Sequence, residues 1–294
     1  MTRLEHPYQH LDPAGGWLRG NLHTHTTQSD GVEAPQAVID AYAAAGYDFL
    51  MLSDHDIFSG AELYRTLDAR GMTLIPGNEV TANALHLLHV NGDRRVEPHR
   101  NRQQVIDEIA ATQGFAIVNH PNWQWGPTPL CPPEELAAMS AFAGMEIFNG
   151  VIRRLEGSPY ATDCWDKRLS QGERMWGYAH DDSHEPGDRF LGWNMVWSAD
   201  RGVDALVEAL RHGRFYASTG VVIRKLESDG MQVHIEAENA DRIVAVTDFR
   251  LRLGQSDTND LTVTVPETKQ YVRFECWGRG EEFAWSQPFF VVKD

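Results

Sequence analysis

The chain has 294 residues and a formal net charge of −16, and apolar residues make up 42% of it. This length accommodates one large α/β domain, or a domain of roughly 200 residues with a smaller one, around a sizeable core. The negative charge argues against a broad basic surface for nucleic acid, and no apolar run approaches the roughly 18 residues of a membrane helix. Neither a nucleic-acid partner nor a membrane partner is therefore expected.

The start of the chain and its cysteines indicate a cellular compartment. Residues 1–16 are polar and lack the apolar segment of a signal peptide. The three cysteines, Cys131, Cys164 and Cys276, are scattered and odd in number, so they do not form a disulfide framework and read as small buried apolar residues. We therefore expect a cytoplasmic protein.

Residues 17 to about 212 alternate between short apolar runs and amphipathic segments. Helix-like segments rich in Ala, Leu and Glu separate most of the runs, and the first of these segments has Pro35 near its start and Gly46 after its end. Strands that alternate with helices predict βαβ units and a parallel sheet, and about seven units favour a barrel over an open sheet. The strand-like runs are 17–23, 49–56, 73–80, 85–92, 115–121, 145–150 and 175–184.

The pattern changes near residue 214. From there to the C-terminus, apolar and polar residues alternate, and Gly, Asn and Asp turns recur at short spacing. This pattern is typical of antiparallel strands with one solvated face. We expect two domains, 1–213 and 214–294, with the small β-domain joined after a helix at 202–213.

Side chains that can bind metals follow almost every predicted strand. In a parallel α/β barrel the carboxyl ends of the strands open on one face, so these side chains are expected to converge there. In chain order they are His23, His25 and Asp30; Asp54, His55 and Asp56; Glu79; His86 and His89; His120; Glu146 and Asn149; and His180, Asp181, Asp182 and His184.

Spacing and chemistry narrow this set. His23 and His25 are two residues apart and so leave an extended strand on the same face, as do Asp182 and His184. The set contains imidazoles and carboxylates but no thiolate, which suits Zn²⁺, Mn²⁺ or Fe²⁺. Because one ion takes roughly four to six ligands, the set indicates two or three divalent ions, with Glu79 as a bridging carboxylate.

The ordered motifs NLHTHTTQSDG, LSDHD, GNEV, HLLHV, NHP and DDSH resemble those of the PHP (polymerase and histidinol phosphatase) superfamily. The resemblance covers about residues 17–190 and implies a distorted (βα)7 barrel with a trinuclear metal centre. The extension that begins GRFYASTG resembles the β-domain of the branch that includes carbaryl hydrolase. Carried over position by position, the family's ligands are His23, His25, Asp30, His55, Glu79, His89, His120, Asp182 and His184. His86, His180 and Asp181 remain as alternative ligands.

Other side chains carry weaker expectations. Asp54 and Asp56 are read as groups that orient His55 or cap a helix, and Glu146 as either a substrate contact or a strand end. His180 and Asp181 are the candidate acids for proton transfer, with simple packing as the alternative for His180. The candidate substrate-binding residues are Arg153, Arg154, Trp123, Trp125 and Asn149.

These features predict a metal-dependent hydrolase, foremost a phosphoesterase that acts on a small phosphorylated molecule. A metal-bridging hydroxide would attack in line, and an acid such as His180 would assist the leaving group. The alternatives are a carboxylic or carbamate ester hydrolase on the same metals, a nuclease, which the charge disfavours, and a binding protein with a degenerate site. Homo-oligomer formation is left open.

Overall fold

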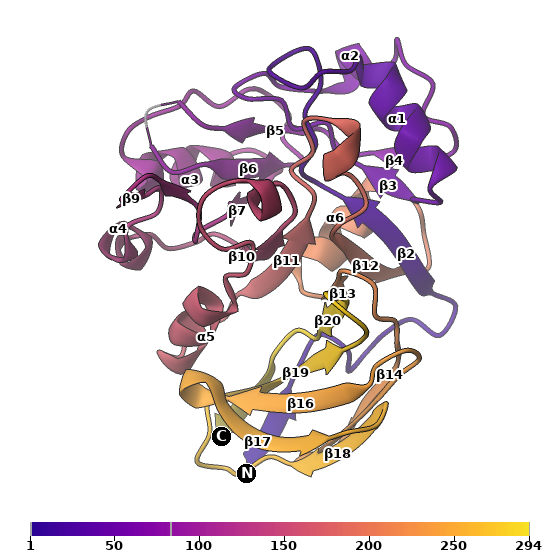
Figure 1. Cartoon of the computed structure of the whole chain (residues 1–294), viewed down its shortest axis with the longest axis vertical. Helices are drawn as coiled ribbons and strands as arrows, with labels where there is room; N and C mark the ends of the chain where they lie inside the picture. Colours follow the sequence, from indigo (N-terminus) through magenta and orange to yellow (C-terminus); the bar gives the residue numbers. More distant parts are fainter. Residues whose placement is uncertain (1, 83, 294) are drawn as a thin grey trace.

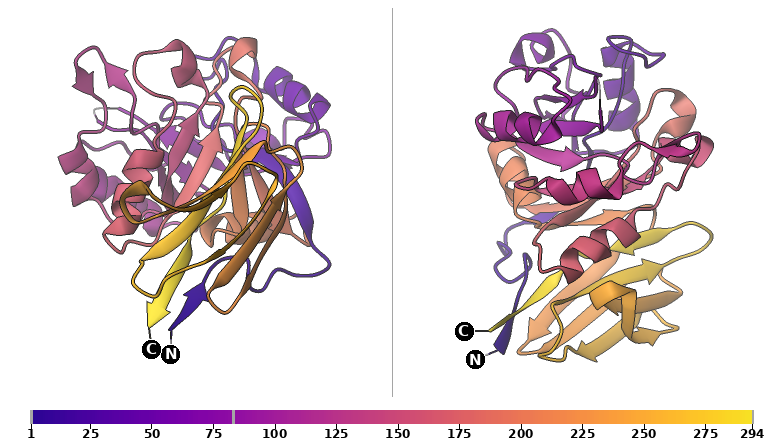
Figure 2. Two further views of the ribbon diagram at one scale, coloured as in Figure 1. Left: turned by 60° about the horizontal axis from the view of Figure 1, so that its bottom comes forward. Right: turned by 90° about the vertical axis from the view of Figure 1, so that its left-hand side faces the viewer.

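The computed structural model describes residues 2–82 and 84–293. A region of mixed strands and helices lies above a region built from antiparallel strands, coloured orange to yellow (Figure 1). The two chain ends lie close together at the far end of this β-region (Figure 2). Strand β1 near the N-terminus pairs with β21 near the C-terminus, which explains this proximity.

A five-stranded sheet forms the centre of the upper region. Its strand order is β11-β10-β7-β6-β5. Strands β7, β10 and β11 are parallel, whereas β5, β6 and β7 are antiparallel, so the expectation of uniformly parallel βα units is wrong for this segment. The strands are β5 (Gly77–Val80), β6 (Leu87–Val90), β7 (Phe115–Val118), β10 (Gly144–Asn149) and β11 (Trp176–His180).

A second sheet of 11 strands runs through both regions. In the upper region, β2 and β3 are parallel, β3 and β4 are parallel, and β12 is antiparallel to β2. The order β1-β21-β19-β20-β13-β12-β2-β3-β4 then continues into the β-region, where β16 joins β19 and β17 joins β16. The strands are β1 (Thr2–Glu5), β2 (Gly16–Asn21), β3 (Phe49–Leu50), β4 (Thr73–Leu74), β12 (Trp193–Ser198), β13 (Phe215–Ser218), β16 (Arg242–Thr247), β17 (Leu251–Ser256), β19 (Tyr271–Trp277), β20 (Phe283–Trp285) and β21 (Phe289–Lys293).

The described strands do not close into a continuous (βα)7 barrel. Two isolated bridges connect the sheets at the carboxyl ends of their strands, one between Thr24 and Ser183 and one between His55 and Glu79. These bridges hold the ends of β2, β3, β5 and β11 together. The fold is therefore mixed α/β, with its strand ends gathered at one side.

Side-chain amides complete the open edge of β11. The Asn194 amide donates to the Ala179 carbonyl at 3.0 Å and accepts from its N–H at 3.1 Å. The Gln287 amide makes the same pair of bonds with Gly177, each at 2.9 Å. These two side chains replace a neighbouring strand, since buried backbone groups require partners.

In the described ranges, six α-helices pack around the sheets, and several have recognisable ends. Pro35 lies in the first turn of α1, and Gly46, with φ +78°, follows its end. The Asn101 side chain caps α3 by accepting a hydrogen bond from the Gln103 N–H. The helices are α1 (Pro35–Ala44), α2 (Ala61–Tyr64), α3 (Arg102–Ala110), α4 (Pro133–Ala138), α5 (Thr162–Ser170) and α6 (Val203–Arg211). Of these, α1 and α6 lie within two segments, 35–46 and 202–213, for which helices were predicted.

The β-region has an apolar core of its own. A three-stranded sheet, β14 (Ile223–Asp229), β15 (Gln232–Ala237) and β18 (Asp260–Thr264), packs against β16 and β19 through residues such as Ile235 and Phe274. Leu4 and Tyr8 from the N-terminus belong to the same core. The division at 213/214 stays a prediction. The structure adds that the segment from Thr2 to Tyr8 packs with the β-region.

Two other features complete the fold. Short elements lie in loops of the upper region and at one corner of the β-region: β8 (Gln124–Trp125), β9 (Thr128–Pro129), η1 (Val151–Arg154), η2 (Pro186–Asp188) and η3 (Asp248–Arg250). Among the described helices, none is both long enough and apolar enough to cross a membrane.

Candidate metal centre

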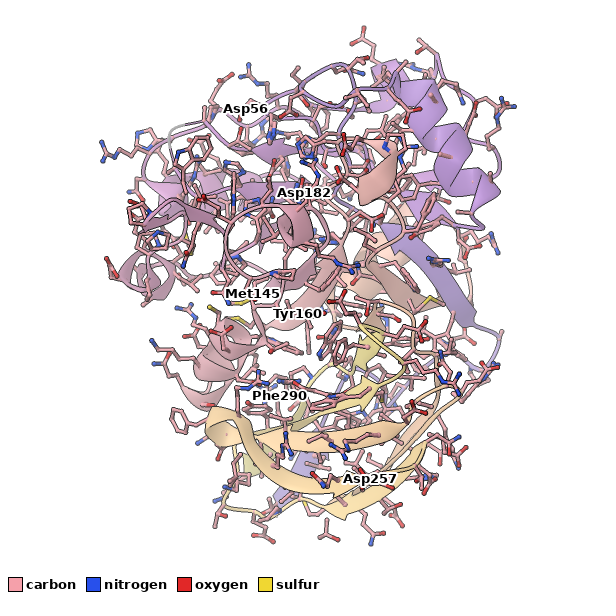
Figure 3. The ribbon with its side chains drawn as sticks, in the orientation of Figure 1. Asp56, Met145, Tyr160, Asp182, Asp257 and Phe290 are labelled. Atoms are coloured by element: carbon pink, nitrogen blue, oxygen red, sulfur yellow. The ribbon has the colours of Figure 1, made fainter. Side chains whose placement is uncertain are left out.

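Histidines and carboxylates from seven segments converge where the two sheets meet. Asp182, labelled in Figure 3, lies in the middle of the upper region, far from Asp257 and Phe290 in the β-region. His23 and His25 follow β2, His55 follows β3, Glu79 lies in β5, and His120 follows β7. The fold therefore brings these side chains, which are distant in the sequence, to one place in the upper region.

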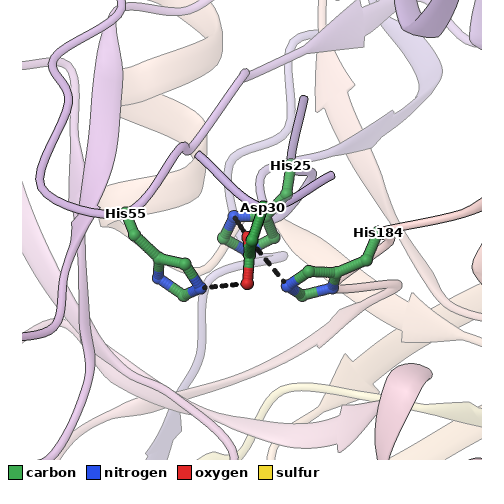
Figure 4. Close-up of side chains that lie close together, drawn as sticks. All are labelled: His25, Asp30, His55 and His184. Atoms are coloured by element: carbon green, nitrogen blue, oxygen red, sulfur yellow. Dashed lines mark ion pairs between the residues drawn. The ribbon is translucent and has the colours of Figure 1, made fainter. Parts of the chain in front are cut away.

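Asp30 stands at the centre of an outer group with three imidazoles (Figure 4). Its carboxylate oxygens lie 3.4 Å from His184 Nε2, 3.5 Å from His55 Nε2 and 3.9 Å from His25 Nδ1. Burial raises the pKa of Asp30, but contacts with His184 and His55 outweigh it and hold the pKa well below its usual range. The outer group thus brings three imidazole nitrogens close to one carboxylate. Its members are His25, Asp30, His55 and His184.

Glu79 is the centre of an inner group. Its oxygens lie 2.7 Å from His55 Nδ1, 3.2 Å from His86 Nδ1, 3.3 Å from His23 Nε2 and 3.4 Å from His120 Nε2. Although its complete burial raises the pKa of Glu79, the surrounding imidazoles hold the pKa well below the usual value. Glu79 and His55 link the inner and outer groups, as a bridging carboxylate would.

Asp182 lies between the two groups. Its Oδ1 is 3.0 Å from His25 Nε2 and 3.1 Å from His23 Nε2, and its Oδ2 is 3.8 Å from His120 Nε2. Asp182 has φ +53° and His120 has φ +26°, conformations that side-chain-bearing residues rarely adopt. The backbone is therefore strained at two of the converging residues.

Several atoms of these groups are buried without a hydrogen-bond partner. They include His23 Nε2, both ring nitrogens of His25, Glu79 Oε2 and Asp182 Oδ1. An unpartnered buried polar atom is costly, and buried charges are normally paired or coordinate metals. The orphaned nitrogens and carboxylate oxygens face one another, so the donor set fits divalent cations with mixed imidazole and carboxylate ligands.

Glu146 supports the cluster from behind. One oxygen lies 2.6 Å from His23 Nδ1 and 2.8 Å from His180 Nδ1, and the other accepts the His120 backbone N–H at 2.7 Å. Asn149 donates to Glu146 at 2.8 Å and to Asp182 at 3.1 Å. The bond to Nδ1 orients the His23 ring so that Nε2 faces the inner group. Glu146 and Asn149 therefore position ligand candidates and do not line the cavity above them.

His86, not His89, belongs to the cluster. His89 Nε2 instead contacts the Thr112 hydroxyl at 3.2 Å, beyond the end of α3. Side chains alternate along a strand, so His86 shares the inner face with Leu88, whereas His89 lies on the outer face. The prediction that His89 lies among the converging side chains is wrong. His86 occupies the position that was predicted for His89.

The two candidate acids lie outside the cavity. His180 is fully buried behind His23, and its Nε2 has no hydrogen-bond partner. Asp181 points away from the cluster and accepts bonds from the Tyr42 hydroxyl and from the N–H groups of Phe190, Leu191 and Gly192. Burial raises the pKa of Asp181 to about 6. The carboxylate of Asp181 therefore secures the 190–192 loop outside the cavity, and its role in proton transfer stays a prediction.

Asp54 and Asp56 each accept hydrogen bonds from a neighbouring loop. Asp54 accepts bonds from Thr26 and Ser29 and so shapes the loop that carries Asp30. Asp56 accepts bonds from the backbone and hydroxyl of Thr81, just after β5.

A cavity of about 380 Å³ opens over the cluster. Of the predicted substrate-binding residues, Trp123 and Arg154 line it. Arg153 instead pairs with Glu281 of the β-region, and Trp125 is 74% exposed on the hairpin of β8 and β9. The cavity residues are Asp30, Val32, His55, His86, His120, Trp123, Val151, Ile152, Arg154, Leu155, Asp182, His184 and Glu185. The wall formed by Val151, Ile152 and Leu155 escaped the sequence analysis, because apolar residues after a strand carry no distinctive signal.

No family model matches the chain. It is 34% identical over 79 residues to a 5′-3′ exoribonuclease of Haemophilus influenzae, and 38% identical over 74 residues to a 3′,5′-nucleoside bisphosphate phosphatase of Chromobacterium violaceum. The matches cover 25% and 24% of this chain, and 29% and 26% of those proteins. The chain thus spans between a quarter and a third of the length of the relatives it matches.

The fold has a full-length counterpart among solved structures. A two-domain protein of Bacteroides vulgatus that contains a predicted PHP-like metal-dependent phosphoesterase superposes on 99% of this chain and 98% of its own. The TM-score is 0.58 and the sequence identity is 18%. The chain therefore has the PHP-like fold that its motifs indicated.

Proposed function

We propose that this chain, with its PHP-like fold, is a metal-dependent phosphoesterase that hydrolyses a small phosphorylated molecule. The observation that carries the proposal is the set of buried, unpartnered nitrogens and oxygens that face one another beneath the cavity. The names of the two relatives, an exoribonuclease and a nucleoside bisphosphate phosphatase, support ester hydrolysis at phosphorus.

The ligand set that we propose follows the family's, with His86 in place of His89. His25, Asp30, His55 and His184 would hold one ion, and the inner group around Glu79, with Asp182, would hold one or two more. Zn²⁺, Mn²⁺ and Fe²⁺ all suit these ligands. When bound, such ions neutralise charge on the phosphoryl group and lower the pKa of water.

The protein's own side chains have separate roles. His55, His86, His120 and His184 direct the reacting phosphoryl group to the floor of the cavity. Trp123 and Ile152 exclude water from its walls, which strengthens electrostatic interactions inside. Glu146 keeps His23 in one orientation, and His180 contributes by its contact with Glu146.

The test compares two histidines of one segment. The chelator-treated protein is reconstituted with Mn²⁺ or Zn²⁺ and assayed on phosphomonoesters and phosphodiesters, with the metal content measured in parallel. His86→Ala should lower kcat/KM by at least about 100-fold, the upper end of the loss expected for groups that merely support ligands. The matched control His89→Ala should retain turnover and metal content. An active His86→Ala variant, or no turnover with any divalent ion, would contradict the proposal.

The apolar wall also favours a second candidate, the hydrolysis of a carboxylic or carbamate ester on the same metals. Trp123, Val151 and Ile152 suit an apolar ester. The same preparations, assayed on naphthyl acetate and naphthyl methylcarbamate, separate the two reactions. Turnover of these esters without turnover of any phosphate ester would favour the second candidate.

A further inference from the structure

The cavity over the cluster has two unlike sides. The floor consists of candidate metal ligands, whereas the wall is largely apolar. Val151 and Ile152 are almost fully buried in this wall, and Leu155 and Val32 lie at its open edge, 41% and 61% exposed. A cavity of about 380 Å³ lies at the lower end of the range of roughly 300–1,000 Å³ that is typical of ligand sites. A ligand that fills it must place one charged end on the floor and an apolar portion against the wall.

Trp123 gives the apolar wall a fixed aromatic surface. Its ring centroid lies 5.0 Å from that of His120 and 5.7 Å from that of His86, with interplanar angles of 86° and 70°. These edge-to-face contacts are a favourable geometry for aromatic pairs and hold the indole beside the ligand histidines. A ring attached to a phosphate on the floor would therefore meet the Trp123 side chain.

The wall offers little attraction to a second phosphate. Arg154 is the single Lys or Arg side chain among the described residues that line the cavity. Asp188 engages its guanidinium through two hydrogen bonds of 2.6 and 2.8 Å, and Glu185 lies 3.7 Å from its Nε. One cation with two carboxylates leaves this side of the cavity net negative, so a second phosphate would meet repulsion.

We propose that the substrate is a phosphomonoester of an apolar alcohol or phenol that carries no second phosphate. This inference rests on the proposed function and specifies its substrate class. In the reaction, a water oxygen forms a bond to phosphorus, the bond between phosphorus and the ester oxygen breaks, and the departing alkoxide or phenoxide takes a proton. The products are the apolar alcohol and inorganic phosphate. Trp123 determines specificity by its contact with the leaving group.

The experiment compares phosphates whose leaving alcohols have similar reactivity. The full-length, Mn²⁺-loaded protein is assayed on benzyl phosphate, glycerol 3-phosphate and adenosine 3′,5′-bisphosphate. The kcat/KM for benzyl phosphate should exceed the values for glycerol 3-phosphate and the bisphosphate by at least about 10-fold. The reason is that the benzyl ring leaves water and is buried against the apolar wall. Binding of benzylphosphonate and methylphosphonate, measured by calorimetry, should show the same preference without turnover.

Variants test the wall and its charge separately. Trp123→Ala should lower the ratio of benzyl to glycerol phosphate turnover by about 10-fold. Trp125→Ala is the matched control on the same loop and should leave that ratio unchanged, because Trp125 does not line the cavity. Glu185→Gln should raise kcat/KM for the bisphosphate by about 2- to 5-fold, the effect of removing one exposed charge.

The outcomes separate this inference from the proposed function. Preference for glycerol 3-phosphate or the bisphosphate, or an unchanged ratio in Trp123→Ala, would overturn the substrate class and leave the phosphoesterase proposal standing. No turnover of any phosphate, with no binding of either phosphonate, would overturn both.

Discussion

The two regions of the molecule each bury a cluster of charged side chains, and the clusters differ in how their polar atoms are satisfied. Between α5 and the β-region, Arg273 donates to both oxygens of Asp166 at 2.6 Å and to Glu275 at 2.9 Å. The Tyr271 hydroxyl also donates to Asp166, at 2.8 Å. Only Nη1 of the Arg273 guanidinium lacks a partner. Around Glu79 and Asp182, by contrast, several buried atoms have no hydrogen-bond partner: His23 Nε2, both ring nitrogens of His25, Glu79 Oε2 and Asp182 Oδ1.

The difference indicates what each cluster does. Arg273 and Asp166 neutralise each other within the protein, so their cluster joins α5 to β19 without any added group. The cluster around Glu79 contains more nitrogen and oxygen atoms than its hydrogen-bond donors can pair with. This is the expected state of a site that binds cations. Buried charge alone does not distinguish a structural network from a functional site, whereas the pattern of missing hydrogen bonds does.

The largest effect is expected when the satisfied network is broken. Arg273→Ala should lower the free energy of unfolding by about 3–5 kcal/mol, because Asp166 and Glu275 would lose their buried cation and keep only their ion pairs with the partly exposed Arg250. Urea denaturation measures this loss. The exposed pair of Arg242 with Asp257 provides the control, and Arg242→Ala should cost less than about 1 kcal/mol. Similar losses in the two variants would contradict the structural role of the network.

A smaller effect is expected when the support of the other cluster is altered. Glu146→Gln should weaken metal binding by about 10- to 100-fold, because the amide no longer holds both the His23 ring and the His120 backbone. Calorimetry with Mn²⁺ measures this change.

Asp181→Asn is the matched control for that experiment. Asp181 is an equally buried carboxylate, but its partners are Tyr42 and a loop backbone. This variant should lose stability and keep its metal affinity. Equal metal affinity in Glu146→Gln and the wild-type protein would show that Glu146 does not position the ligands.

The smallest effect is expected in the β-region, where the free energy of unfolding should depend on pH. His6 stacks on Phe289 with ring centroids 4.1 Å apart, and burial lowers the pKa of His6 to about 4. Since the folded protein favours neutral His6, its contribution is complete above pH 6.5 and is lost as the pH falls toward 4. The advantage of wild type over His6→Phe in unfolding free energy should shrink by about 2 kcal/mol between pH 7 and pH 5. A constant difference would contradict this assignment.

Much of the site could be predicted because its residues follow strands and obey alternation. His23 and His25 both face the cluster, as expected from their spacing. Asp182 and His184 also face it, although the backbone at Asp182, with φ +53°, is not extended. Alternation did not distinguish His86 from His89, because both faces of β6 are buried and apolar residues occupy each. The assignment of the converging histidines and carboxylates as metal ligands stays a prediction.

Other features had no local signal in the sequence. The antiparallel pairing of β5, β6 and β7 depends on which strands become neighbours, and short apolar runs do not record this. Asn194 and Gln287 satisfy β11 from distant parts of the chain, so their spacing reveals nothing about that contact. The sequence predicted Arg153 as a substrate contact, because its actual partner, Glu281, is 128 residues away and no local pattern links the two.

The amide pair along β11 has a consequence for protein engineering. The Gln287 side chain comes from the β-region and bonds to Gly177, three residues before His180 on the strand that leads to Asp182 and His184. A truncated chain that lacks the β-region would leave the Gly177 backbone at the edge of β11 without these partners. Such an edge invites pairing with other chains, so the isolated half is a poor choice for expression.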